Sequence, residues 1–233
     1  MMKKTAIMQP YFFPYIGYWQ MMNAVDDFVV YDDVNYIKNG WVNRNNILLN
    51  SQKHLVTVPL SGASPFLLIN QIKVCQDKKR EKLLKTIEQA YKKAPFFSEV
   101  FPIVFNTVMY PSEFIVDALY FSIKEISSFL EMKTNLILSS TLAKKNELKG
   151  KDKVINVCQL LNTDVYINAI GGLKLYDKND FKQNNIDLYF IKTNDISYPQ
   201  FGKEFVSGLS IIDVLMFNSK LDVQKLLSEY TLI

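Results

Sequence analysis

The side chains best suited to chemistry lie in the segment YDDVNYIKNGWVNRNN, residues 31–46. Asp32 and Asp33 follow a short apolar run, and carboxylates can act as general bases or bind metal ions. Arg44 can form a bidentate contact with a carboxylate or phosphate, and Trp41 can cover the face of a sugar or base. This variety of binding groups favours a functional site. The alternative is a charged loop with a tryptophan anchor and an aspartate N-cap.

A second group of polar residues lies among aromatic rings in IMQPYFFPYIGYWQMMNA, residues 7–24. Gly17 leads into a helical pattern, where glycine permits close approach to the backbone and a helix N-terminus attracts anions. Gln20 and Asn23 are three residues apart, so both amides can point to one side of that helix. With Gln9 after the preceding apolar run, these features indicate a small-molecule site. The alternative is an aromatic core cluster with a capping asparagine.

Two weaker candidates for ligand binding lie further along the chain. Gly171 and Gly172 belong to NAIGGLKLY, which ends at Tyr176, and a glycine pair is also typical of a simple turn. Ser139 and Ser140 begin a Ser-Ser-Thr segment that could receive a phosphate, although helix capping is the expected role.

Other reactive residue types are sparse. His54 is the only histidine and is expected to be structural or exposed, which disfavours a His-dependent triad and a His-ligated zinc site. Cys75 and Cys158 lie in unrelated contexts without a CxxC motif, as is typical of reduced cysteines in a cytosolic protein. Asp213 is expected to form hydrogen bonds from a helix, with a place in the site as the alternative.

Composition predicts a globular protein, and the length predicts one domain with an elaboration or two small domains that share an interface. Of these we expect residues 1–233 to form one α/β domain. Of 233 residues, 48% are hydrophobic and 21% are charged. The net charge of +4, from 27 Lys and Arg against 23 Asp and Glu, is weaker and less clustered than nucleic-acid binding usually requires. The chain has no signal-peptide pattern and no apolar run of the roughly 18 residues that a membrane span needs. We therefore expect a cytoplasmic protein without a membrane span.

Hydrophobic periodicity predicts alternating strands and helices. Strands are predicted at 5–8, 28–31, 46–49, 55–60, 69–74, 136–138, 165–168 and 188–191, the third and fourth as a hairpin. Helices are predicted at 19–24, 77–92, 96–109, 112–131, 151–161, 177–184, 209–217 and 221–230. This order predicts a mainly parallel, Rossmann-like sheet flanked by helices, with a helical block at about 77–131. Because ligands bind beyond the carboxyl ends of parallel strands, the clusters at 9–23, 31–45 and 168–176 should converge on one pocket.

The opening AIMQPYFFPYIGYWQMMNAVDDFVVYDDVNYIKNGWVNRNNI resembles the signature of the WbqC-like protein family. Three later segments, YINAIGGLKLY, SYPQFG and LSIIDVLMFN, resemble the downstream blocks of that family. The resemblance spans almost the whole chain. It implies a place among the products of bacterial O-antigen and capsule clusters, where amino sugars are built and N-acylated. The implied partner is a small molecule, a nucleotide-sugar or amino sugar.

A more distant resemblance concerns the turn PYIGYWQMMN at 14–23, which has the frame of the strand-to-helix turn of pantothenate synthetase and related nucleotidylyltransferases. Gln20 and Asn23 stand where those enzymes carry two histidines, and amides can also donate hydrogen bonds to phosphate. The segment SSTL at 139–142 resembles their phosphate-binding element. The implied cofactor is ATP, which can activate an acid, or a separate acyl donor.

These resemblances and residues together favour an enzyme that forms an amide by transferring an acyl or aminoacyl group to a nucleotide-linked amino sugar. Such a reaction needs a base, a donor to the acyl oxygen and a grip on diphosphate. The expected base is Asp32 or Asp33, and the expected donors to the acyl oxygen are Gln20 and Asn23. Arg44 and Lys38 are expected to bind the diphosphate.

Two alternatives remain open from the sequence. The first is a metal-dependent glycosyl- or nucleotidylyltransferase in which Asp32 and Asp33 bind magnesium. The second is a nucleotide-sugar-binding protein without catalytic activity. Dependence on magnesium would identify the first, and binding without turnover would identify the second.

Overall fold

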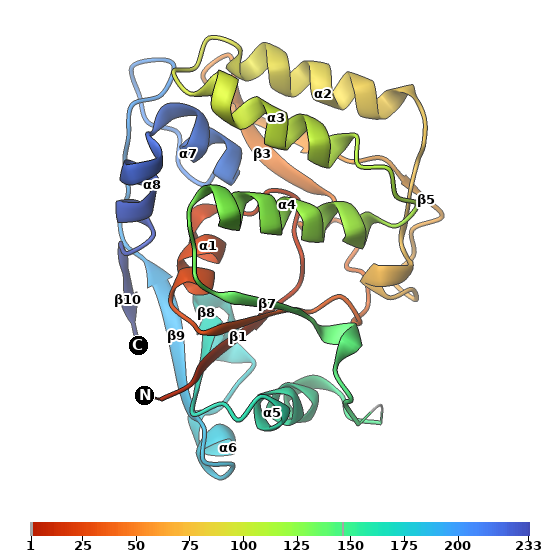
Figure 1. The fold of residues 1–233 in the computed structure, drawn as a ribbon, viewed down its shortest axis with the longest axis vertical. Helices are drawn as coiled ribbons and strands as arrows, with labels where there is room; N and C mark the ends of the chain where they lie inside the picture. Colours follow the sequence, from red (N-terminus) through yellow and green to blue (C-terminus); the bar gives the residue numbers. More distant parts are fainter. Residues whose placement is uncertain (1, 146) are drawn as a thin grey trace.

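A six-stranded sheet forms the centre of the computed structural model, which describes residues 2–145 and 147–233 (Figure 1). The spatial order of its strands is β10-β9-β8-β1-β2-β7. Five strands run parallel to their neighbours: β1 (Lys4–Met8), β2 (Asp27–Val30), β7 (Asn135–Leu138), β8 (Val165–Ala169) and β9 (Asp187–Thr193). The sixth strand, β10 (Tyr230–Leu232), pairs antiparallel with β9 at one edge. This arrangement confirms the predicted α/β fold with a mostly parallel sheet.

Both faces of the central strands are buried, which explains their continuous apolar sequences. In β2, Phe28 and Val30 point into one hydrophobic cluster and Val29 points into another on the opposite face. In β1, Ala6 and Ile7 divide between the same two clusters. The period of two along a strand thus places helices on both sides of the sheet.

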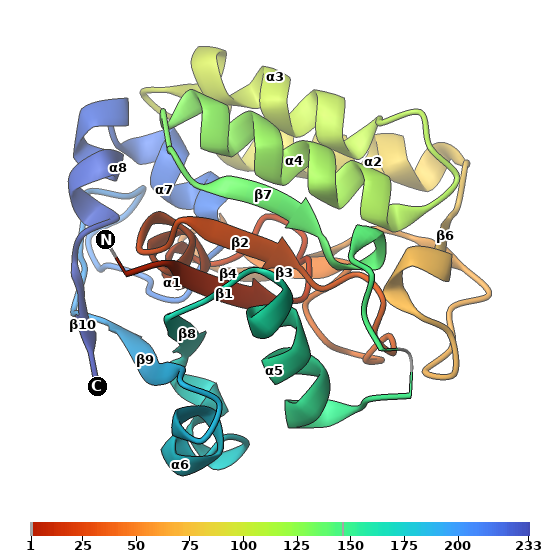
Figure 2. The ribbon, with the colours of Figure 1, turned by 60° about the horizontal axis from the view of Figure 1, so that its bottom comes forward.

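The two faces carry unequal numbers of helices (Figures 1 and 2). The hydrophobic cluster on one face includes residues of α1 (Ile16–Asn23), α4 (Ile115–Phe129), α7 (Ile211–Phe217) and α8 (Lys220–Leu226), and it extends to α2 (Lys78–Tyr91) and α3 (Phe97–Val108), which pack on β3 (Arg44–Leu49), α4 and α7. The other face packs against α5 (Gly150–Leu160) and α6 (Lys178–Lys182).

The predicted helical block consists of α2, α3 and α4. The Asp77 side chain caps α2 by accepting a hydrogen bond of 2.9 Å from the backbone N–H of Lys79. Buried Arg80 donates to the carbonyl oxygens of Val108 and Tyr110 at 2.7 Å each, and so joins α2 to the end of α3. A cation is favourable there because the last carbonyls of a helix carry partial negative charge.

Two predicted elements are wrong. The strand predicted at 69–74 is instead a 3-10 turn, η1 (Ile69–Gln71), followed by the short strand β6 (Lys73–Val74), which pairs with β5 (Leu60–Ser61). The helix predicted at 221–230 ends at Leu226, and the chain then forms β10. The conformation of both segments depends on the strand that is available to pair with them.

The predicted hairpin is present as β3 (Arg44–Leu49) and β4 (Gln52–Thr57). Its two turn residues, Asn50 and Ser51, have positive φ angles of 51° and 59°, as a tight hairpin turn requires. Among the described residues, no helix is long and apolar enough to cross a membrane.

Two phenylalanine variants test the assignment of the core. Phe28 in β2 is 0% exposed and its ring lies 5.0 Å from that of Tyr18, so Phe28→Ala should lower the free energy of unfolding by about 3–5 kcal/mol. Phe66 is 90% exposed, so Phe66→Ala should change it by less than about 0.5 kcal/mol. Urea denaturation followed by circular dichroism measures both values. Equal losses would contradict this packing.

Candidate functional site

The sheet has a topological switch point beside β1. From β1 the chain proceeds outward through β2 to β7, then crosses to β8 and β9 on the other side. Connections that leave β1 and β8 toward opposite faces open a crevice at the carboxyl ends of these strands, where α/β proteins bind ligands. Met8 and Ala169 are the last residues of the two strands.

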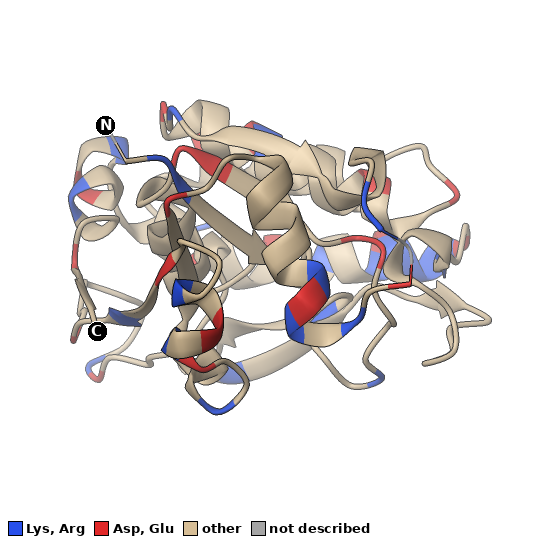
Figure 3. Ribbon diagram, turned by 90° about the horizontal axis from the view of Figure 1, so that it is seen from below, with Lys and Arg blue, Asp and Glu red and all other residues tan. Residues whose placement is uncertain are grey.

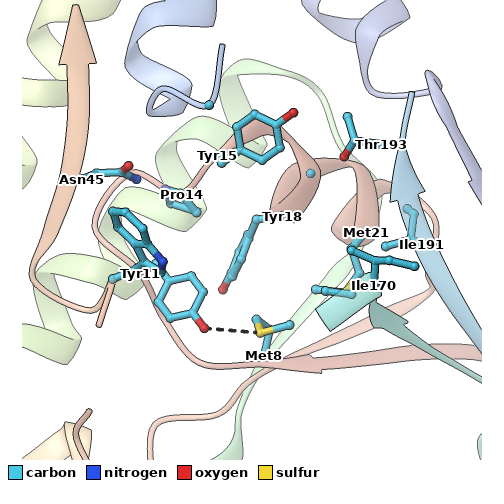
Figure 4. Close-up of a pocket in the computed structure, with 14 residues that line it drawn as sticks. Met8, Tyr11, Pro14, Tyr15, Tyr18, Met21, Asn45, Ile170, Ile191 and Thr193 are labelled. Carbon is cyan, nitrogen blue, oxygen red and sulfur yellow. Dashed lines mark hydrogen bonds between the residues drawn. The ribbon is translucent and has the colours of Figure 1, made fainter. Parts of the chain in front are cut away.

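A cavity of about 370 Å³ occupies this crevice (Figure 4). Its lining comes from three strand ends, the first half of α1 and the loops around them. The lining residues are Met8, Tyr11, Pro14, Tyr15, Gly17, Tyr18, Met21, Trp41, Asn45, Ala169, Ile170, Ile191, Thr193 and Gly208. Residues from the segments 9–23, 31–45 and 168–176 therefore meet at one cavity.

Gly17 allows α1 to approach the end of β9. A Cβ atom at this position would lie 2.7 Å from Thr193 Oγ1 and 3.2 Å from the ring of Tyr15. A side chain at residue 17 would therefore displace Thr193 or Tyr15, both of which line the cavity.

Three tyrosines supply hydroxyl groups around the cavity, and burial raises the pKa of each. The pKa of Tyr18 lies well above its ordinary value because the residue is buried, with a further contribution from Tyr11. Burial also raises the pKa of Tyr11 and of Tyr15. In Tyr15 the effect of burial exceeds that of a hydrogen bond with Thr193, which lowers the pKa. All three phenols are therefore neutral at physiological pH and can donate hydrogen bonds.

The amides predicted on α1 do not line the cavity. Gln20 is buried, and its Nε2 donates to the carbonyl oxygens of Leu226 at 2.8 Å and Glu229 at 2.9 Å. Asn23 is exposed at the far end of α1. Gln9 is half-buried after β1 and is also absent from the lining. Gln20 thus joins α1 to the C-terminal segment, a role that the spacing of the amides did not indicate.

The loop before β3, residues 37–43, reaches the cavity through Trp41, and Asn45 in β3 also lines it. Trp41 is 46% exposed, and its backbone oxygen accepts a hydrogen bond of 3.0 Å from the backbone N–H of Phe12. Arg44 donates through Nε to the Gly40 oxygen at 3.1 Å, and through its terminal nitrogens to the side chain and backbone oxygens of Asn39. Arg44 therefore braces the turn that carries Trp41. Lys38 lies exposed in the same loop.

Asp32 is buried away from the cavity and holds two other segments. One carboxylate oxygen accepts a hydrogen bond of 2.9 Å from the backbone N–H of Ser140, in the turn η2 (Ser139–Thr141). The other accepts from the side chain of Asn70 at 3.2 Å. Ser140 itself is exposed. Asp32 thus ties the loops after β2 and β7 together.

Figure 3 shows basic and acidic positions distributed over the whole ribbon. Asp33 lies in an ion-pair cluster with Lys144 and with Lys153 of α5. Its Oδ2 is 2.8 Å from Lys144 Nζ and 3.1 Å from Lys153 Nζ. Burial raises the pKa of Asp33, but hydrogen bonds from Lys144, Ser139 and Lys153 outweigh that effect and lower it.

The glycine pair lies in η3 (Ile170–Lys174), next to the cavity but outside its lining. A Cβ atom on Gly172 would lie 2.6 Å from Asn168 Nδ2, whereas one on Gly171 would meet open space. Tyr176 packs edge-on against Tyr166 and Phe181 in the hydrophobic cluster under α5 and α6. Gly172 and Tyr176 therefore fix η3 on the sheet.

Asp213 in α7 is fully buried in a hydrogen-bonded network. It accepts from the hydroxyls of Tyr91 at 3.0 Å and Tyr198 at 2.8 Å, and from Gln200 Nε2 at 2.5 Å. Burial raises the pKa of Asp213 despite these three donors. The network holds the segment SYPQFG against α7, and Asp213 does not line the cavity.

The residues that the sequence interpretation missed are the uncharged ones. Tyr11, Tyr15, Tyr18, Met21 and Thr193 line the cavity, but only the aromatic ones carried any signal, through their density around Gly17. Among the residues that the structure describes, no group of three or more His, Cys, Asp and Glu gathers as a set of metal ligands.

Asp33→Asn tests the ion-pair cluster. Lys144 has a side chain only 3% exposed, so loss of its counter-charge should lower the free energy of unfolding at pH 7 by about 3 kcal/mol. The folded-state pKa of Asp33 lies below the unfolded value, so its stabilisation is present above about pH 4 and is lost as pH falls through the lowered pKa. The difference between variant and wild type should shrink over that range in chemical denaturation. Asp222→Asn, in an exposed ion pair with Lys225, is the control and should have little effect.

Arg44→Lys tests whether the guanidinium braces the loop of residues 37–43 that precedes β3. Lysine keeps the charge but cannot reproduce the set of donors to Asn39 and Gly40, so the variant should lose about 1 kcal/mol of stability and shift the fluorescence of Trp41. Exposed Lys38→Arg in the same loop should do neither. Unchanged stability with weakened binding of a nucleotide-sugar would instead indicate a direct contact of Arg44 with ligand.

Comparison with known proteins agrees with the resemblance noted in the sequence. The chain is 26% identical to the uncharacterized protein Rv1507c of Mycobacterium tuberculosis over 230 residues, 93% of this chain and 94% of that protein. No solved structure matches the chain. The sequence model of the WbqC-like protein family matches residues 9–225. The chain belongs to the WbqC-like protein family.

Proposed function

We propose that the protein is a transferase of bacterial O-antigen or capsule biosynthesis that forms an amide on an amino sugar, carried as a nucleotide-linked sugar. The observation that carries this proposal is the cavity at the switch point, where neutral tyrosine hydroxyls face a crevice between β1 and β8. The likeness to proteins of surface-polysaccharide clusters supplies the substrate class.

Amide formation joins the amine nitrogen to the carbonyl carbon of an acyl donor while the bond from that carbon to the leaving group breaks. Negative charge develops on the carbonyl oxygen, and neutral phenols are suitable donors to it. None of the lining residues carries a carboxylate, so the amine reacts as the free base. Its proton then leaves to solvent at the mouth of the cavity, where Tyr15 is 41% exposed.

The positions of Asp32 and Asp33 argue against the metal-dependent alternative. Asp33 is already neutralised by two ammonium groups, and both carboxylate oxygens of Asp32 accept hydrogen bonds from the protein. A magnesium ion at Asp32 would have to displace these partners, and one at Asp33 would lie beside two ammonium groups. The product assay described next distinguishes the proposed enzyme from a nucleotide-sugar-binding protein without turnover.

Ligand-dependent thermal shifts across nucleotide-linked amino sugars, ATP and acyl-CoA compounds, with and without magnesium, will identify the substrates. Mass spectrometry of mixtures of the stabilising compounds should then detect an N-acylated sugar. Its rate of formation should rise with pH until the amine is deprotonated. Stabilisation by a nucleotide-sugar without any amide product, across all donors, would identify a binding protein.

Gly17→Ala tests whether this cavity is the reaction site. The added Cβ would crowd Thr193 and Tyr15, so kcat/KM should fall at least about tenfold, a loss of about 1.4 kcal/mol of transition-state stabilisation. Gly171→Ala, which adds a methyl group to open space outside the lining, should keep full activity. Melting temperatures of both variants show whether the fold is intact. Equal activity of the two variants would place the reaction elsewhere.

A further inference from the structure

The cavity lining is uncharged, and this restricts what can enter. None of the fourteen lining residues is Asp, Glu, Lys, Arg or His. Burial of a charged group without a partner is strongly unfavourable, so neither a phosphate nor the ammonium group of an aminoacyl moiety is suited to this space.

A sugar ring carries several hydroxyls, and besides one amide the polar side-chain groups of the lining are the hydroxyls of three tyrosines and Thr193 and the indole N–H of Trp41. Asn45 is the only amide among the lining residues, and both hydrogens of its Nδ2 are used by the carbonyl oxygens of Phe12 at 3.0 Å and Phe13 at 2.8 Å. Its Oδ1 accepts from the backbone N–H of Asn46 at 2.8 Å. A sugar buried here would leave several hydroxyl groups without partners, at a cost for each.

One end of the cavity nevertheless holds two hydroxyls without good acceptors. The Tyr11 hydroxyl is 3.8 Å from the sulfur of Met8, which is a weak acceptor. The Tyr18 hydroxyl is buried and has no hydrogen-bond partner among the described residues. In Figure 4 it points toward Met8, whose flexible side chain closes this end of the cavity. A ligand oxygen that displaced Met8 would satisfy both phenols.

Charge is available only outside, at the mouth. Lys53 Nζ lies 3.3 Å from the position that a Cβ atom on Gly208 would occupy, and Gly208 lines the cavity. Lys53 is exposed and can meet an anionic group that remains in solvent. The exposed carboxylate of Asp195 acts on Tyr15 from outside the lining, so the arrangement separates a neutral interior from an edge with charges of both signs.

We infer that the cavity takes the acyl half of the substrate pair, as an uncharged, apolar acyl group of several carbon atoms. Its carbonyl oxygen accepts hydrogen bonds from Tyr11 and Tyr18 once the Met8 side chain moves aside. The sugar and its phosphates stay at the mouth. This inference rests on the proposed function. It selects a larger apolar acyl group over formyl, acetyl or aminoacyl groups. A formyl or acetyl group would leave most of the cavity of about 370 Å³ empty, and the cavity is lined by methionine, isoleucine and aromatic side chains.

A series of primary carboxamides from acetamide to octanamide tests the acyl pocket directly. The Kd values, measured by isothermal titration calorimetry, should fall about fourfold for each added methylene until the cavity is full. Hexanoate and hexylammonium, of the same length but charged, should bind at least about tenfold more weakly than hexanamide. Affinity independent of chain length, or preference for a charged probe, would overturn the inference.

Tyr18→Phe separates ligand binding from a structural role. Removal of a buried hydroxyl without a partner should leave the melting temperature unchanged or raised, yet weaken hexanamide binding about fivefold. Tyr189→Phe, on β9 outside the cavity, is the matched control and should change neither value. A lower melting temperature with unchanged hexanamide affinity would show that Tyr18 serves only the fold.

Competition distinguishes this inference from the proposed function. UDP-glucosamine, which has a free amine and no acyl group, should bind together with hexanamide. Displacement of hexanamide by UDP-glucosamine would overturn the assignment of the cavity to the acyl group even if amide synthesis is detected. If the affinity for carboxamides depends on chain length but no amide product forms, the apolar pocket is supported and the proposed function is contradicted.

Discussion

The parallel pairing of β1 with both β2 and β8 is the constraint on which the rest of the structure depends. Ala6 lies opposite Phe28 on one side and Ile167 on the other, so β1 is fixed on both edges and buried on both faces. Because the chain leaves β1 and β8 toward different layers, no loop fills the space between the two strand ends. α1 and η3 border that space, and the cavity is what remains between them.

The charged and amide side chains near this space chiefly hold its loops in place. Arg44 braces the turn of Trp41, Asp32 joins the turns after β2 and β7, and Asp33 binds two lysines. Asp213 performs the same task for the SYPQFG segment through Tyr198 and Gln200. Buried polar groups require partners, and here the protein itself supplies most of them. The charged residues thus form a frame around a cavity whose lining they do not join.

This division explains why the cavity is chemically neutral. Its hydroxyl groups belong to tyrosines whose burial raises their pKa, so they donate hydrogen bonds without carrying charge. A site of this kind is suited to an uncharged carbonyl or hydroxyl oxygen within an apolar group. Anionic parts of a ligand gain more at the mouth, where Lys53 is in contact with solvent.

The sequence by itself determined the fold class, the three segments that meet at the switch point and the family. These follow from local periodicity, from apolar runs such as 28–31 and from the motif around Gly17, all of which are short-range properties. Only the tertiary structure decided which side chains of those segments face the cavity. Gln20 binds C-terminal carbonyls, Asp32 binds the η2 turn and Arg44 binds the loop backbone. The sequence did not indicate these contacts, because the partners are distant in sequence or appear only once a loop has folded. The same reason applies to β10, whose strand conformation depends on the free edge of β9.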